Sequence, residues 1–284
     1  MSFILNLILS SKNWSTIIVL IFLFNSQIVS QDREKISEQD KNGNIILEGE
    51  IDIYDEKIDT VWIRRFSSNG KKIEEKRFKN GAIHGSWKGW FVNGSKKFVK
   101  KYNNGIMSGT FDQYDSTGFR ILKGRYKNGE LHGKQREWYS NGTLRKETVF
   151  RNGVLYGTFR EWEKSGDQNI DGQYKNNLKD GQWNYHEKGK RTRYEYYRSG
   201  ELISFYDFEY YKNGQLKEEP SFVDGIKDGT WTKYFKNGRK SSHYEFQNGK
   251  PDGEWITWHD KIFIKAREME YKDSLLVNDY REWW

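Results

Sequence analysis

The sequence predicts an all-β protein, an extended and twisted antiparallel meander sheet built from tandem 24-residue β-hairpin repeats. Three observations predict this fold class. Glycines recur on a lattice of 24 residues, aromatic side chains keep fixed places in each cycle, and Asn-Gly pairs separate the aromatic runs. Asn-Gly favours tight hairpin turns, and short aromatic-rich runs favour strands. No connection is long enough for a crossover between parallel strands, so the pairing is antiparallel.

Columns of glycine and tryptophan define the repeat. The lattice glycines are Gly85, Gly109, Gly133, Gly157, Gly181, Gly229 and Gly253. The tryptophans two places further on are Trp87, Trp183, Trp231 and Trp255. A second aromatic column lies five places after each lattice position, and Phe205 fills the one lattice place without glycine. Because two and five differ in parity, either both faces of the sheet carry aromatic side chains or a bulge re-aims one column.

Each cycle contains two turn signals. The first, for example Asn93-Gly94, is expected to form a type I′ turn, because both residues accept positive φ. The second, for example Asn104-Gly105, precedes the lattice glycine by several residues and is expected to be a longer hairpin connection. Two strands per cycle give a rise of about 10 Å, so about nine or ten cycles would extend over roughly 90–100 Å.

The chain divides into three predicted segments. Residues 1–30 contain no acidic residue, and their apolar run from Trp14 to Phe24 is too short for a membrane span of about 20 residues. This pattern is typical of a secretory signal peptide. Residues 31–60 are expected to form a degenerate repeat or cap, and residues 61–284 the repeat array. We therefore expect export to the periplasm, the outer membrane or the exterior; the alternative is an inner-membrane anchor formed by an uncleaved N-terminus.

The amino-acid composition excludes several kinds of functional site. The chain has no Cys, which excludes a disulfide framework, a thiolate zinc site and a cysteine nucleophile. Only 35% of residues are hydrophobic while 17% are aromatic, which suits a sheet with at least one solvated face and burial carried by rings. The formal net charge is +8, with 48 basic and 40 acidic residues interleaved.

The repeat unit reads Gly-x-Trp-x-x-Tyr/Trp-x-x-Asn-Gly, followed by an aromatic residue and a second Asn-Gly. It is most complete at residues 229–249. This unit resembles the bacterial MORN-repeat variant family, often labelled the YwqK-type antitoxin component, over roughly residues 60–284. The resemblance implies a β-hairpin array that acts in protein or membrane association. An antitoxin or immunity partner of a toxin is the alternative that the label implies.

No residue pattern indicates catalysis. His84 and His132 share a column but lie two cycles apart, about 20 Å along a sheet, too far for one metal ion. Asp180, Asp228 and Asp252 recur in the same column as copies of a turn. A catalytic site needs one singular constellation, and a repeat of interchangeable columns supplies none. We therefore expect no enzyme, no cofactor and no metal site.

Two rows of basic residues are the candidate binding positions. A Tyr/Phe column lies 17 places into most cycles, and the row one place after it is Lys79, Lys127, Arg151 and Lys175. The row just before the first hairpin glycine is Lys164, Lys188, Lys212 and Lys236. They predict either a stripe for anionic lipid or glycan, or simple protection of strand ends against aggregation. The expected function is a non-catalytic exported scaffold whose partner is an unidentified protein or envelope component; nucleic acid is disfavoured by export.

Overall fold

The computed structural model describes residues 32–54, 57–260 and 264–281. All regular elements in these ranges are β-strands, which confirms the predicted all-β class. They belong to two compact units, Met1–His132 and Gly133–Trp284. The predicted signal peptide, residues 1–30, lies outside the described residues. Within the described ranges, no helix is long and apolar enough to cross a membrane.

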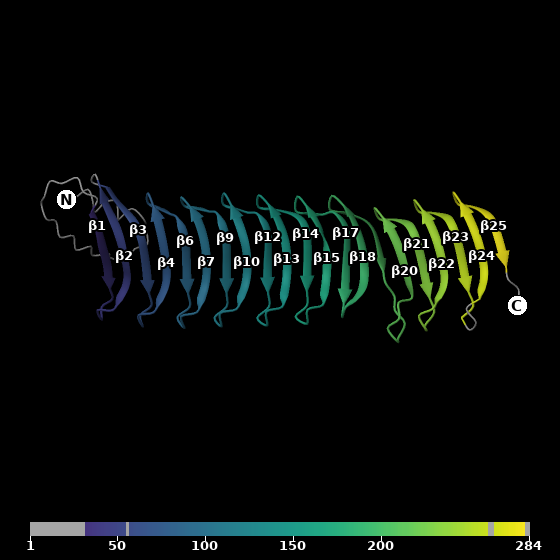
Figure 1. Cartoon of the computed structure of the whole chain (residues 1–284), viewed down its shortest axis with the longest axis horizontal. Helices are drawn as coiled ribbons and strands as arrows, with labels where there is room; N and C mark the ends of the chain where they lie inside the picture. The colour runs from purple at the N-terminus through teal and green to yellow at the C-terminus, as the bar shows by residue number, and fades with distance from the viewer. Residues whose placement is uncertain (1–31, 55–56, 261–263, 282–284) are drawn as a thin grey trace. The chain divides into compact units, whose positions relative to one another are not determined.

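The first unit is an antiparallel meander in which each strand pairs with the next along the chain (Figure 1). Very short strands follow alternate turns and pair back on the strand before them. The strands are β1 (Asp32–Gln39), β2 (Ile45–Tyr54), β3 (Lys57–Phe66), β4 (Lys72–Lys79), β5 (Ala82–Ile83), β6 (Gly85–Trp90), β7 (Lys96–Asn103), β8 (Ile106–Met107), β9 (Gly109–Tyr114), β10 (Arg120–Lys127) and β11 (Glu130–Leu131).

The second unit has the same consecutive antiparallel pairing, but no ladder joins β19 to β20. Its strands are β12 (Gly133–Trp138), β13 (Leu144–Arg151), β14 (Val154–Trp162), β15 (Gln168–Lys175), β16 (Leu178–Lys179), β17 (Gly181–Glu187), β18 (Lys190–Arg198), β19 (Glu201–Asp207), β20 (Glu218–Val223), β21 (Ile226–Tyr234), β22 (Lys240–Gln247), β23 (Lys250–Trp258), β24 (Lys265–Lys272) and β25 (Leu275–Arg281). The predicted meander is confirmed in both units.

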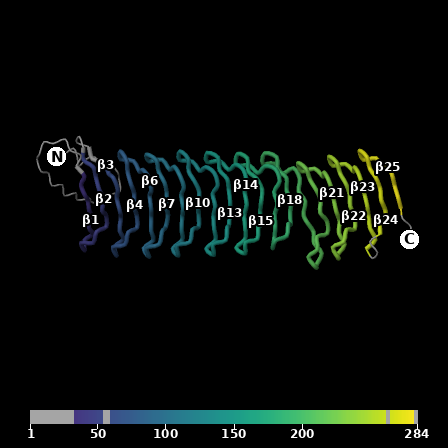
Figure 2. Tube along the Cα trace, in the orientation of Figure 1, coloured from purple at the N-terminus to yellow at the C-terminus, as the bar shows by residue number. Residues whose placement is uncertain are grey.

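The two kinds of turn are exchanged relative to the prediction. Asn104 and Gly105 both have positive φ, 47° and 80°, and form a two-residue type I′ turn between β7 and β8. At Asn93-Gly94 only Gly94 has positive φ. There the Gly94 N–H donates to the Phe91 carbonyl, which is a type I turn closed by a left-handed glycine, the G1-bulge hairpin. Both turn assignments were therefore wrong. We call the strand ends where turns such as Asn104-Gly105 lie the type I′ edge. The opposite strand ends, where turns such as Asn93-Gly94 lie, are the G1 edge (Figure 2).

The lattice glycines all have positive φ and lie at the starts or in the interiors of strands. Gly85, Gly109, Gly133 and Gly181 open β6, β9, β12 and β17, while Gly157, Gly229 and Gly253 lie within β14, β21 and β23. Gly109 reaches φ 107°, a conformation that a side chain resists. It follows β8, where the register changes from Tyr102↔Met107 to Val99↔Asp112. The glycine thus bends the chain from the short strand into the long one.

Both faces of the sheet carry aromatic side chains. Trp87 and Trp90 stand three residues apart in β6 and point to opposite faces. The bulge lies on the partner strand, because Gly89 pairs with Phe98 and Trp90 with Lys96. We call the face of Trp87 in the first unit, and of Trp183 in the second, the aromatic face; the opposite face is the charged face.

Aromatic rings form the core. Trp183 is 1% exposed and lies 5.3 Å from the Phe159 ring and 5.0 Å from the Tyr174 ring, measured between centroids. In the first unit, Trp87 lies 5.5 Å from Phe98. The other column tryptophans pack similarly: Trp231 against Phe246, and Trp255 against Phe246 and Tyr271. The core is therefore a layer of rings repeated from strand to strand, not a central ball.

Hydrogen bonds join successive turns on both edges. On the type I′ edge of the first unit, the Gly129 N–H donates to the Met107 carbonyl at 2.9 Å, and the Gly105 N–H donates to Ile83 in the same way. On the G1 edge, the Asn93 side-chain amide donates to the Ser116 carbonyl at 2.6 Å. Turn contacts of this kind stabilise each cycle against its neighbour.

Candidate functional site

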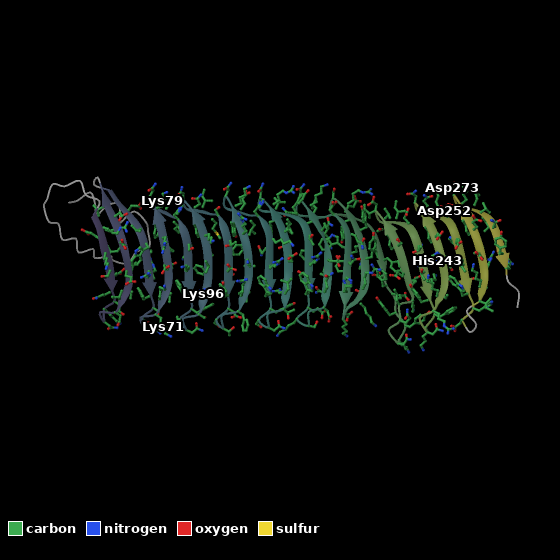
Figure 3. The ribbon with its side chains drawn as sticks, viewed as in Figure 1. Lys71, Lys79, Lys96, His243, Asp252 and Asp273 are labelled. Atoms are coloured by element: carbon green, nitrogen blue, oxygen red, sulfur yellow. The ribbon has the colours of Figure 1, made fainter. Side chains whose placement is uncertain are left out.

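The predicted basic rows lie at opposite ends of the strands. Lys79, Lys127, Arg151 and Lys175 end β4, β10, β13 and β15 at the type I′ edge, while Lys164, Lys188, Lys212 and Lys236 lie in turns at the other ends. All eight side chains are exposed. Figure 3 shows the two ends of β4, with Lys79 of the first row at one end and Lys71, which directly precedes the strand, at the other. Within each unit, the structure does not bring the two rows into one site.

The charged face of the first unit contains a convergent cluster that the sequence analysis missed. Its centre is the carboxylate of Glu75 in β4, whose side chain is only 13% exposed. Arg64 Nε from β3 lies 3.0 Å from Glu75 Oε2, and Lys72 Nζ lies 3.1 Å from the same oxygen. Lys88 Nζ from β6 lies 3.6 Å from Glu75 Oε1. We call these four residues the Glu75 cluster.

The second unit repeats this arrangement around Glu147 in β13, whose side chain is 5% exposed. Arg136 Nε from β12 lies 2.7 Å from Glu147 Oε2, and Lys134 Nζ lies 3.3 Å from Oε1. Arg160 from β14 approaches Oε1 from the other side, at 4.0 Å. These four residues form the Glu147 cluster. As in the first unit, one carboxylate is set among three cations; here all three come from neighbouring strands, whereas Lys72 of the Glu75 cluster lies in β4 itself.

The electrostatics of both clusters keep the central carboxylate charged. Burial alone would raise the pKa of Glu75, but hydrogen bonds from Lys72 and Arg64 outweigh it and lower the pKa to about 2. Burial opposes ionisation of Glu147 too, and hydrogen bonds from Arg136 and Lys134 lower its pKa below the ordinary value. The Glu147 cluster therefore carries three positive charges and one negative charge, while Arg64 of the Glu75 cluster also pairs with Glu48 at 3.1 Å, which adds a second negative charge there.

The surplus charge faces solvent. The side chains of Lys134, Arg136 and Arg160 are 57%, 44% and 47% exposed, although the carboxylate between them is buried. The buried carboxylate holds the exposed cationic groups in place. These side chains therefore lose less conformational freedom when an anion binds to them. The arrangement can bind a phosphate or carboxylate group.

Indole rings flank both clusters on the same face. In the first unit, Arg64 lies 4.5 Å from the Trp62 ring centroid and Lys72 lies 4.2 Å from that of Trp90. In the second, Trp138 and Trp162 stand two places beyond Arg136 and Arg160 in the same strands, hence on the same face. Cations held over indole rings keep an apolar contact beside the charge.

A sequence signal for these clusters exists. Glu75 and Glu147 both stand 14 places into a cycle, while Arg64, Lys88, Arg136 and Arg160 all stand three places into theirs. Antiparallel pairing places each glutamate at place 14 between two basic residues at place three. Glu75 pairs with Arg64 on one side and with Lys88 on the other. Glu147 pairs likewise with Arg136 and Arg160. The signal requires the exact register, which repeat counting alone does not supply.

The aspartates of the column that also contains His84 and His132 have a structural role. Asp228 accepts a hydrogen bond from the Asn248 backbone N–H at 2.9 Å, and Asp252 accepts one from the Asp273 N–H at 3.2 Å. Asp180 does the same for Ser199. Each carboxylate thus caps the next turn on the type I′ edge, where Figure 3 shows Asp252 and Asp273. Among the described residues, no group of three or more His, Cys, Asp or Glu side chains could hold a metal ion.

Comparisons with known proteins add no assignment. No family model matches the chain, and no curated protein matches it. Among solved structures it is similar to the crystal structure of TcdB2-TccC3-TEV, with 11% identity and a TM-score of 0.23, over 87% of this chain and 14% of that one. It is also similar to TcdB2-TccC3 without the hypervariable C-terminal region, with 11% identity and a TM-score of 0.21, over 83% of this chain and 15% of the other. The chain therefore spans about one seventh of those chains, and at these TM-scores the likeness assigns neither fold nor function.

Proposed function

We propose that this protein is a non-catalytic, exported repeat scaffold that associates with an anionic surface of the cell envelope through the charged face of each unit. Export is part of the proposal and rests on the apolar segment within residues 1–30, outside the described residues. The MORN-variant resemblance supports the same class of function, since it implies an array that acts in association.

The observation that carries the proposal is the pair of carboxylate-centred clusters. Each unit has one, with its carboxylate and two of its cations in the same repeat columns. The Glu147 cluster has a surplus of two positive charges; in the Glu75 cluster, Arg64 also pairs with Glu48, which leaves a surplus of one. A basic group near an anionic membrane contributes roughly 1 kcal/mol to binding, so two such clusters favour a surface bearing many anionic groups. Phosphate headgroups and acidic glycans share this chemistry.

The experiment measures binding of the full chain to three probes. These are vesicles of phosphatidylcholine mixed with phosphatidylglycerol, vesicles of phosphatidylcholine alone, and soluble polygalacturonate. We expect binding to an anionic probe that weakens as salt rises from about 0.05 to about 0.5 M, and none to neutral vesicles. The two anionic probes distinguish lipid from glycan as the source of the anion.

Two double variants locate the binding face. Arg136→Gln with Arg160→Gln removes two cluster cations and should weaken binding by about tenfold or more. Lys164→Gln with Lys236→Gln removes the same charge from exposed turns of the same unit and should weaken it by about threefold or less. Equal losses would show that net charge alone decides binding, and tight binding to neutral vesicles would refute the proposal.

A further inference from the structure

Strand β19 has one uncovered edge in the middle of the second unit. It pairs with β18 on one side, and no ladder joins its other side to β20. The connection between β19 and β20 is closed only near its turn, by the Tyr210↔Leu216 bridge and a hydrogen bond from the Lys217 N–H to the Glu209 carbonyl. Everywhere else in this unit, consecutive long strands form a continuous ladder within the described residues.

Side-chain packing explains why β20 leaves the edge open. Phe222 of β20 stacks on Tyr194 of β18, with centroids 4.7 Å apart and planes 8° apart. Tyr196 Oη donates to Asp224 at 2.9 Å, from the same face of β18. The end of β20 therefore lies over the charged face of β18 and β19 instead of continuing in their plane.

The pattern of β19 itself causes this displacement. The aromatic column of the repeat falls on Asp207 here, and the rings stand beside it at Tyr206 and Phe208. Tyr206 pairs with Tyr194 and contacts the rings of Phe222 and Trp231. The aromatic packing thus passes to the opposite face at this strand, and the second sheet follows it.

The open edge is apolar and exposed. Phe205 is 55% exposed, Leu202 42% and Ile203 41%. Phe205 and Leu202 pair with Glu195 and Tyr197, so both lie on the aromatic face, where the second sheet does not cover them. A strand edge with unpaired backbone groups beside exposed apolar side chains is a template for an added strand.

The chain from β19 to the end of β20 is acidic, whereas β18, on the paired side of β19, is basic. Residues 201–224 contain six acidic and two basic side chains, a net charge of −4 in a chain of net charge +8. The acidic side chains are Glu201, Asp207, Glu209, Glu218, Glu219 and Asp224. Asp207 and Glu209 are 58% and 68% exposed even though each has a cationic neighbour. This charge selects against anionic strands and favours cationic ones.

We propose that the free edge of β19 binds an extended segment of a partner polypeptide, with alternating apolar and basic residues, as an added strand. The segment's backbone pairs with β19, its apolar side chains contact Phe205 and Leu202, and its cationic side chains face the acidic surroundings. This site is separate from the two clusters on the charged face, and its occupant has the opposite charge.

The test uses the full chain and a labelled synthetic peptide of four Val-Lys repeats. We expect saturable binding and slower amide hydrogen exchange across residues 201–207 when the peptide is bound. The same peptide N-methylated along its pairing edge should bind at least about tenfold more weakly, since it cannot form the backbone ladder. A Val-Glu peptide should also bind at least about tenfold more weakly.

Variants at the β19 edge are compared with matched control variants elsewhere in the protein. Phe205→Ser and Asp207→Lys should each weaken peptide binding by about fivefold or more, while Phe119→Ser and Glu130→Lys, exposed positions in the first unit, should not change it. Unchanged affinity for the N-methylated peptide, or binding without protection of residues 201–207, would overturn the proposal. Protection of these residues by self-association, without peptide, would overturn it as well, because the occupant would then be a second copy.

Discussion

The indole of Trp183 in β17 lies directly over Gly172 in β15, so close that a β-carbon at Gly172 would overlap the ring. Gly89 stands in the same relation to the ring of Phe98 in the first unit. Neither glycine has positive φ. These glycines therefore serve packing, whereas the lattice glycines serve backbone conformation, and the two kinds should respond differently to substitution.

Gly172→Ala should lower the free energy of unfolding by about 2–3 kcal/mol, because Trp183 is 1% exposed and has no free space to move into. Gly166→Ala is the control: its φ is 99°, but its nearest neighbour is a methyl group at 3.9 Å. Only backbone strain of about 1 kcal/mol is expected there. Denaturant melts monitored by tryptophan fluorescence give both values. A smaller loss at Gly172 than at Gly166 would contradict the packing role.

Asn141 makes two different hydrogen bonds on the G1 edge. Its Oδ1 accepts from the Thr143 N–H at 3.1 Å within the turn, and its Nδ2 donates to the Lys164 carbonyl of the next turn at 3.1 Å. Asn141→Asp keeps the first bond and loses the second, so we expect a loss of about 1 kcal/mol. Asn141→Ala loses both and should cost more. Thermal melts compare them with Asn103→Asp at the exposed end of β7, and no difference from that control would show that the link between turns contributes nothing.

Asn237 makes the same link to a carboxylate. Its Nδ2 donates to the Asp260 carboxylate at 3.1 Å. Asn237→Asp places a second carboxylate against the first, and the two negative charges repel. The loss of stability should exceed that of Asn141→Asp and should shrink as salt rises from about 0.05 to about 0.5 M, because salt screens exposed charges. A loss that is independent of salt would rule out repulsion as its cause.

The fold class followed from sequence because glycine and ring columns recur, but the turn types did not. Asn93-Gly94 and Asn104-Gly105 carry the same dipeptide, yet only Asn104 has positive φ. What distinguishes them is loop length, which is set by strand register: Lys96 pairs with Trp90 across the first turn, and Asn103 pairs with Ile106 across the second. The dipeptide is compatible with both turns.

The candidate site was harder to predict for a related reason. The rows such as Lys79 and Lys127 are visible as columns along the sequence, but each side chain is exposed at a strand end or turn of its own. The carboxylate and two of the cations in each cluster come from two columns, at places 14 and three of the cycle, that meet only across strands. The bulge at each hairpin shifts the pairing by one residue, as between Glu137 and Trp138, so a count that ignores it puts the wrong side chains together.

Glu75→Gln should alter the acid sensitivity of the protein. The folded-state pKa of Glu75 is about 2, below its ordinary value of 4.5, so its carboxylate stabilises the fold fully above about pH 4.5. That contribution is lost as pH falls from about 4.5 to about 2. At neutral pH the variant should be about 1–2 kcal/mol less stable, because Lys72 and Lys88 lose their counter-charge and Arg64 keeps only Glu48. The difference from wild type should vanish by about pH 2.

The measurement is the free energy of unfolding of both proteins across that pH range. Glu130→Gln, which changes an exposed carboxylate in β11, is the control and should track wild type throughout. A Glu75→Gln deficit that stayed constant from neutral pH down to about pH 2 would mean that lost packing, and not the ionised carboxylate, accounts for it.

Lys179 is bound to a polar network on the aromatic face. Its Nζ donates to Tyr185 Oη at 2.6 Å and to Tyr197 Oη at 3.2 Å, and both hydroxyls donate to the Glu195 carboxylate. Burial, together with the bond to Glu195, raises the pKa of Tyr185 to about 12, so the hydroxyl keeps its proton and donates at neutral pH. The ammonium also lies 4.5 Å from the centroid of the Trp183 ring.

Lys179→Met should keep the aliphatic contact with Trp183 but leave Glu195 with less positive charge around it, at a cost of about 1–2 kcal/mol. Glu195→Gln alone should cost a similar amount, because Lys179 then loses its counter-charge. The double variant removes both charges and should be more stable than the sum of the two losses predicts by about 1 kcal/mol. Other cycles place Ile83, Met107 and Leu155 at the position of Lys179, so the site accepts an apolar side chain. Strict additivity of the two losses in denaturant melts would show that the network has no coupling and that Lys179 acts only as a packing residue.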